Sequence, residues 1–158
     1  MLPFYAAYYE VLRTLFNEIE QIIDRLPQTA LDWSPGADMN SVSVLTTHLV
    51  GSTRYWIVDV AGGRGAADRD RASEFSARGK DGAQLKAQIA AMLDQIERTL
   101  SQLELDDLVL ERAAPLQGRS VNAGWALAHA LAHVGTHLGH IQMTQQLWEA
   151  RQPYPVKE

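Results

Sequence analysis

The chain has 158 residues, of which 46% are hydrophobic and 21% charged, with a net charge of −5 and no cysteine. This length and composition predict one folded domain, 1–158, and exclude a chain that is disordered throughout. The acidic balance, without a cluster of lysines and arginines, argues against nucleic acid as a partner. Because cysteine is absent, disulfides, thiolate nucleophiles and iron–sulfur clusters are excluded, and His, Asp and Glu remain as the strong metal ligands.

The first residues carry neither a basic segment nor a small-residue cleavage motif, so we expect no secretory signal and a cytoplasmic location. Residues 120–148 contain no Asp, Glu, Lys or Arg over 29 positions, which is long enough to cross a bilayer. Four histidines and several amide and hydroxyl side chains within this stretch make insertion costly. We therefore expect no membrane-spanning segment.

The first two predicted helices come from apolar residues spaced three and four positions apart. One runs over Phe4–Leu26 and is ended by Pro27, which cannot continue a helix. Ser41 or Ser43 can cap the second, which ends near Gly62. Both helices have one apolar face, so both are expected to pack against a common core.

A long connection and a third helix follow. Residues 64–80 are rich in Arg, Asp, Ala and Gly and show no clear period, which predicts a long exposed connection. Asp81 and Gln84 have the spacing of a capping box, and apolar positions then recur at helical spacing as far as Leu103.

The last part of the chain predicts a linker and a fourth helix. Residues 104–118 contain an acidic patch, a proline and a glycine, and Ser120 can cap a helix that runs toward Trp148. No stretch alternates polar and apolar residues as a strand does. The sequence therefore predicts an all-α fold, a four-helix bundle with its long connection between helices 2 and 3.

Four of the five histidines fall within twelve residues, at His129, His133, His137 and His140. At about 100° per residue, all four share one helix face beside the apolar positions. Two imidazoles four residues apart can bind one metal ion, and both His129/His133 and His133/His137 have that spacing. His48 lies at the edge of the apolar face of the second helix and can supply a third ligand. Three histidines with an open coordination position are typical of catalytic zinc.

Other roles for these side chains are also consistent with the sequence. The histidines can be core residues satisfied by neighbouring polar groups, or a pH-sensing cluster. Packing several imidazoles together without a metal would leave ring nitrogens unsatisfied, at about 1–3 kcal/mol each, so metal binding is favoured. Asp59 shares the face of His48 three turns later, and its position favours a charge at the helix end over a ligand.

These features resemble the DinB/YfiT-like superfamily of metalloenzymes, and the resemblance covers nearly the whole chain. It rests on Trp33-Ser34-Pro35, on the following Ser-capped helix with His48, and on the H-x-x-x-H pair in the late helix. In many members Arg-Gly-Gln follows the second ligand of that pair, whereas this chain has Leu138-Gly139-His140.

The resemblance implies one divalent ion, zinc or nickel, bound by His48, His133 and His137, and we expect His140 or His129 to lie behind these ligands. It also implies the spatial order 1-2-4-3, with helices 2 and 4 as parallel neighbours and residues 64–80 crossing the diagonal. Because the ligands must be neutral, we expect the affinity for metal to fall below about pH 6.

A three-histidine ion with an open position can turn a bound water or thiol into a nucleophile at neutral pH without cysteine. We therefore expect a small-molecule metalloenzyme. The resemblance implies a thiol-dependent S-transferase, acting with a low-molecular-weight thiol, or a hydrolase. The alternative is a non-enzymatic, stress-related module that binds a metal or a ligand.

One face of the fourth helix is made of small, uncharged residues, Ala128, Ala132, Gly135 and Gly139, opposite the histidines and leucines. Such a surface permits close approach of another helix. We therefore expect a homodimer through the fourth helix. The alternative is that a loop or the first helix covers this face within one chain.

Overall fold

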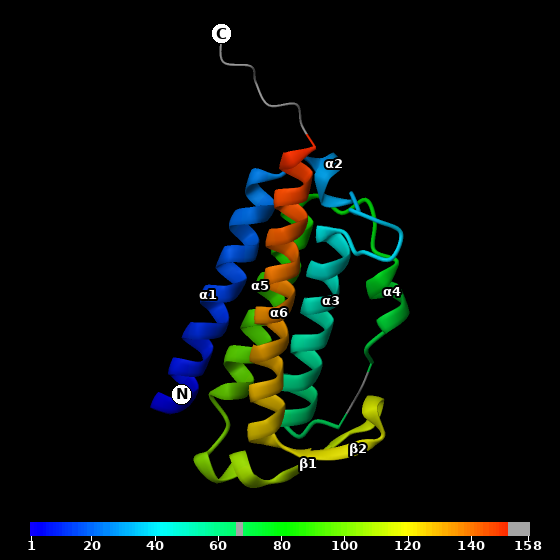
Figure 1. Ribbon diagram of the computed structural model, residues 1–158. Helices are drawn as coiled ribbons and strands as arrows, with labels where there is room; N and C mark the ends of the chain where they lie inside the picture. Colours follow the sequence, from blue (N-terminus) through cyan, green and yellow to red (C-terminus); the bar gives the residue numbers. More distant parts are fainter. Residues whose placement is uncertain (66–67, 152–158) are drawn as a thin grey trace.

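The computed structural model describes residues 1–65 and 68–151 and is mostly helical (Figure 1). Four long helices lie side by side: α1 (Pro3–Arg25), α3 (Val42–Arg54), α5 (Gly82–Leu100) and α6 (Ala123–Ala150). A buried π-helical segment, η1 (Tyr55–Ala61), continues α3 without a break. Two short helices, α2 (Gln28–Leu31) and α4 (Arg71–Phe75), lie in the connections before α3 and before α5.

The segment between α5 and α6 contains strands, which the sequence analysis did not predict. After the 3-10 turn η2 (Leu105–Val109), strand β1 (Glu111–Ala114) pairs antiparallel with β2 (Arg119–Asn122). A second 3-10 turn, η3 (Pro115–Gln117), and Gly118 connect them. Each strand has only four residues, too few for polar and apolar residues to show a period of two.

Local capping interactions explain where the long helices begin. The Ser41 side chain accepts a hydrogen bond from Val44 N at 3.2 Å, and Asp81 and Gln84 form both bonds of the predicted capping box. The cap of α6 is Asn122, whose side chain accepts from the Trp125 backbone N–H, and not Ser120, which belongs to β2. The hairpin takes up the two residues before the cap, so α6 begins later than predicted.

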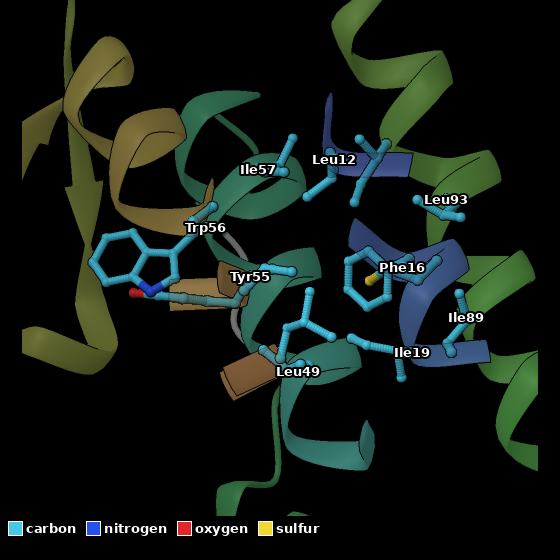
Figure 2. Close-up of a cluster of buried hydrophobic side chains, with 14 of the residues drawn as sticks. Leu12, Phe16, Ile19, Leu49, Tyr55, Trp56, Ile57, Ile89 and Leu93 are labelled. Atoms are coloured by element: carbon cyan, nitrogen blue, oxygen red, sulfur yellow. The ribbon is translucent and has the colours of Figure 1, made fainter. Parts of the chain in front are cut away.

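The core forms between the apolar faces of the long helices (Figure 2). Phe16 of α1, Leu49 of α3 and Ile89 of α5 are all fully buried in it. Trp56 of η1 lies on the side toward α6, where its ring meets the ring of Trp125 at 5.4 Å between centroids. The apolar positions from which the helices were predicted are therefore the ones that bury surface, which is the main driving force for folding.

The arrangement of the helices differs from the one that the resemblance implied. Both α1 and α3 pack on α5 and on α6, which gives the order α1, α6, α3, α5 around the core. Helices α3 and α6 are neighbours, as expected, but they are antiparallel, since His48 meets His133 while Trp56 meets Trp125. The order 1-2-4-3 and the parallel pairing were therefore wrong.

The long connection explains this arrangement. Helices α3 and α5 run in the same direction, and the described part of the connection contains α4, which lies beside α3 (Figure 1). Because α3 and α5 are adjacent, the expectation that residues 64–80 join diagonally opposite helices was wrong. Within the ranges 1–65 and 68–151, no helix is long and apolar enough to cross a membrane, and this includes the uncharged α6.

Candidate metal centre

Three histidines meet where α3 and α6 cross. His48 Nε2 lies 3.3 Å from His133 Nε2, and His137 Nε2 lies 3.2 Å from the same atom. One nitrogen from each ring lies within 4.8 Å of the other two, so the group could hold a metal ion. His48 is 2% exposed, whereas His133 and His137 are half-buried at the edge of α6. The two helices therefore aim three nitrogen donors at one point.

The spacing of these nitrogens fits a tetrahedral ion. Zinc–imidazole bonds of about 2.0–2.1 Å at tetrahedral angles place two ligand nitrogens about 3.4 Å apart. The two Nε2 separations, 3.3 and 3.2 Å, are close to that value. Three neutral nitrogen donors also suit both zinc and nickel, so the donor set does not select between these metals. The residues present therefore fit a divalent ion.

Burial keeps two of the imidazoles neutral. Desolvation, together with the nearby imidazoles, lowers the pKa of His133 to about 3, and desolvation and His48 lower that of His137 to about 4. Both rings therefore carry a free lone pair well below neutral pH, and protons compete for them only in acid. We therefore expect protons to displace a metal from His133 and His137 at a lower pH than the pH 6 predicted from the sequence.

A buried ion pair orients His48 from behind. Glu74 Oε2 lies 2.9 Å from His48 Nδ1, and Arg69 approaches both Glu74 oxygens at 2.7 Å in a bidentate pair. Because the carboxylate accepts the Nδ1–H, the lone pair of His48 is on Nε2, which faces the other histidines. Burial alone would raise the pKa of Glu74, but the hydrogen bonds from Arg69 and His48 lower it to about 2.

The sequence analysis missed Glu74 and Arg69 because it predicted residues 64–80 to be an exposed connection. Glu74 is 5% exposed, and the Arg69 side chain is 4% exposed. Both belong to the segment around α4, whose cap is Asp70, with its carboxylate accepting from Ser73 N at 3.1 Å. That aspartate followed by a serine three residues later is a weak local signal for a helix start. A five-residue helix is too short to show an apolar period.

Close packing of α4 on α3 brings Glu74 to His48. A Cβ atom on Gly51 would collide with the Glu74 carboxylate, so glycine is needed at this position of α3. Phe75, next along α4, lies against His48, with 4.7 Å between the ring centroids. α4 thus supplies both a hydrogen-bond acceptor and an aromatic cover for the same imidazole.

The two remaining histidines of α6 have different surroundings. His140 Nδ1 lies 3.2 Å from His137 Nδ1, on the side away from His133. His129 stacks on Trp125 at 4.8 Å and meets the edge of Trp56 at 4.7 Å. Its nitrogens are not part of the three-histidine group. By spacing alone, His129/His133 and His133/His137 were equally possible as the pair that shares a metal ion. The structure brings only the second pair to His48.

Among the described residues, Asp59 is not part of the three-histidine group. It is 4% exposed in η1, and Arg54 lies 3.3 Å from its carboxylate. Burial raises its pKa, and Arg54 opposes this effect. The sequence analysis favoured a charge at the helix end, but Asp59 is buried within the helical segment η1.

The chain was compared with known families and with solved structures. A family model described as the DinB superfamily matches residues 12–141. Among solved structures, a conserved protein from Enterococcus faecalis is similar with a TM-score of 0.76 at 14% identity, covering 96% of this chain and 100% of that one. A DinB-like protein from Bacillus subtilis has a TM-score of 0.69 at 17% identity, covering 94% and 95%.

A DinB-like protein from Bacillus cereus is also similar, with a TM-score of 0.60 at 12% identity, covering 96% of this chain and 95% of that one. No curated protein matches the chain. At identities this low, the likeness to solved structures shows a shared fold, while substrates and reactions are not transferred by it.

Proposed function

Because the chain belongs to the DinB superfamily and brings three histidines to one point, we propose that it is a metal-dependent enzyme acting on a small molecule. In this proposal the four long helices form a four-helix bundle, and one zinc or nickel ion is bound between α3 and α6. The ligands are His48, His133 and His137. The observation that carries the proposal is the spacing of their Nε2 atoms, which suits tetrahedral coordination.

Each residue around the group has a defined task. Arg69 holds the Glu74 carboxylate, Glu74 accepts the Nδ1 proton of His48, and His48 therefore presents Nε2 as a lone-pair donor. His133 and His137 remain neutral because burial lowers their pKa values. A divalent ion bound there supplies Lewis acidity at an open coordination position. Thiol-dependent S-transfer and hydrolysis are the two reaction classes that we propose for such a position.

Metal content tests the first half of this proposal. Untagged protein, stripped with a chelator and reloaded separately with zinc or nickel, is expected to hold one ion per chain by elemental analysis. H133A and H137A are expected to lose the ion, and H129A, changed by the same substitution on the same helix, is the matched control. Unchanged metal content in H133A would overturn the assignment of the ligands.

Turnover tests the second half. Metal-loaded protein is incubated with low-molecular-weight thiols plus electrophiles, and with ester and amide panels, beside H137A. We expect turnover in one of these classes that disappears in H137A. Absence of turnover in every panel, with ligand binding that raises the melting temperature, would instead identify a non-enzymatic binding module.

We further propose that the protein forms a homodimer through α6. Support comes from Ala128, Ala132, Gly135 and Gly139, which are all exposed, so that no described segment of the same chain covers them. Sedimentation at tens of micromolar is expected to give the mass of a dimer. A charge placed on this face by G135R should give monomers, while Q21R, at an exposed position of α1, should not. A monomeric wild-type mass would overturn the proposal.

A further inference from the structure

A second feature lies about one helical turn from the three histidines. It is a pocket of about 220 Å³ between the loop before α3, the start of α3 and the later half of α6. Its apolar wall is formed by Met39, Leu45 and Met143. No role in holding the metal accounts for these three side chains.

Both helices that carry the ligands also line this pocket. Leu45 stands three residues before His48 on α3. His140 forms part of the wall, and its Nδ1 lies 3.2 Å from Nδ1 of the ligand His137. The pocket is therefore next to the metal centre, and His140 is the side chain that joins the two.

The loop that closes the pocket is held in place. Ser34 Oγ lies within hydrogen-bond distance of the carbonyl oxygens of Gly36 and Met39. At the start of the loop, the Trp33 ring packs edge-on against Trp148 of α6, with 5.6 Å between centroids. At its end, Ser41 caps α3. A wall fixed at both ends is largely preformed, as small-molecule sites usually are.

The lining selects an uncharged apolar group. Thioethers are soft and adapt to the shape of a ligand, and Met39 and Met143 line the pocket together with Leu45. The Thr144 hydroxyl already donates to the His140 carbonyl at 2.9 Å. Asp38 lies in the exposed part of the lining and repels anions, and among the described lining residues there is neither lysine nor arginine. Asn40 and His140 are the polar side chains of the lining that can donate a hydrogen bond, so an anionic group would meet no fixed cation here and would lie near the Asp38 carboxylate.

We propose that this pocket binds an uncharged aromatic or short aliphatic group of the substrate beside the metal centre, with His140 at the boundary. An apolar cavity of about 150 Å³ is enough for benzene, so a benzyl-sized group fits. This inference rests on the proposed function only in naming the ligand a substrate, because the pocket itself requires no ion. His140 would act as a positioning residue between the ligand and His137.

Methionine methyl NMR tests the pocket directly, because the chain has four methionines and two of them line it. Methyl-labelled protein, assigned with M39L and M143L, is titrated with benzyl alcohol. We expect saturable shifts at Met39 and Met143 and none at Met92, which is buried in the core, or at Met1. Absence of shifts at the two pocket methionines would overturn the proposal.

A series of ligands and a matched pair of variants test which chemical groups the pocket binds. Affinity for linear alcohols should rise about fourfold with each added methylene until the pocket is full. M143E should weaken benzyl alcohol about tenfold, because a charge then stands beside an apolar ligand. L147E places the same charge one turn further on α6, at a residue that does not line the pocket, and should have no effect. Benzoate binding as tightly as benzyl alcohol would contradict an uncharged ligand.

The titrations are run on both metal-free and metal-loaded protein. Shifts in both preparations support the pocket whatever the metal does. If elemental analysis finds no ion but the shifts persist, the proposed function fails and the pocket proposal stands. If one ion is bound and no shifts occur, the pocket proposal fails and the metal centre stands.

Discussion

His129 and His137 stand four residues to either side of His133 on the same helix, yet they have different neighbours. The ring of His137 faces His48, with 5.1 Å between centroids and an angle of 87°. The ring of His129 lies between Trp125 and Trp56. Because α3 and α6 are antiparallel, the residue opposite His129 is Trp56, two turns after His48.

The difference shows that the facing helix α3 determines which pair of histidines on α6 meets His48. Spacing of four residues on α6 is necessary for two imidazoles to share an ion, but it does not say which pair is used. The choice follows from one histidine on α3 and from the antiparallel packing that places it. Burial lowers the pKa of both His129 and His137, so desolvation alone does not separate them.

The largest expected effect comes from removing His137, and removal of His129 serves as its matched control. H137A removes one of three donors and should weaken zinc binding roughly a hundredfold to a thousandfold. H129A should leave zinc affinity nearly unchanged, because its ring nitrogens lie outside the three-histidine group. Competition with a chromophoric chelator measures both variants. Equal losses in the two variants would show that the pairs on α6 are equivalent.

The next effect concerns the carboxylate that orients His48. E74Q removes the charged acceptor of the Nδ1 proton and is expected to weaken metal binding about 10–100-fold. E97Q, the same change at an exposed position of α5, is the control. The chelator assay applies again. An unchanged affinity in E74Q would mean that the facing helix positions His48 without help from α4.

Gly51 offers a second way to displace the same carboxylate. G51A places a methyl group where the Glu74 carboxylate lies, so we expect about tenfold weaker metal binding. G135A is the matched control, because a Cβ atom there meets no other atom within 4 Å. The double variant G51A/E74Q should be no weaker than E74Q alone, since both changes act through one contact. Additive losses would contradict this explanation.

A smaller effect is expected from pH on the metal-free protein. Histidines in the unfolded chain have pKa values near 6.5, whereas those of His133 and His137 are about 3 and about 4 in the folded state. Between these values the unfolded chain binds more protons, so the free energy of unfolding falls as the pH decreases from about 6.5 to about 4. Each kcal/mol lost lowers the melting temperature by about 2–4 °C.

H133A/H137A should show a weaker dependence of melting temperature on pH over this range. The lowered pKa of Glu74, about 2, adds a further loss of stability only in stronger acid, because its contribution is present above the unfolded pKa and disappears as the pH falls toward 2. A melting temperature that is constant from pH 7 to pH 4 in the wild type would contradict the neutral, buried imidazoles.

The sequence predicted the parts of the site that lie on long helices and missed the parts on short ones. Periodicity over twelve residues was enough to place His133 and His137 on one face, and the Ser41 cap fixed the helix of His48. Glu74 could not be found in the same way, because α4 has only five residues. Its burial depends on a glycine 23 residues earlier, and no local pattern connects the two.

Local sequence patterns also could not predict the directions of the helices. The long connection is compatible with a diagonal crossing and with a return beside α3, and only tertiary packing decides between them. The strands of the hairpin were missed because four residues each are too few for a period to appear. The group of three histidines that could hold a metal was nevertheless predicted. The antiparallel packing of α3 on α6 brings His48 to His133 and His137, the same pair that was expected from parallel packing.

The smallest expected effect concerns His140, which stands behind His137 as Glu74 stands behind His48. When His137 donates from Nδ1, the acceptor is the ring nitrogen of an exposed imidazole at 3.2 Å, whereas His48 donates to a buried carboxylate. Hydrogen bonds to a charged acceptor are roughly twice as strong as neutral ones, and solvent can replace an exposed acceptor. H140A should therefore weaken zinc binding only about threefold, far less than E74Q. H140Q, which keeps an acceptor, should restore most of the loss. A loss in H140A as large as that in E74Q would show that the two ligands depend equally on their supporting residues, and that burial of the Glu74 pair is not what sets its strength.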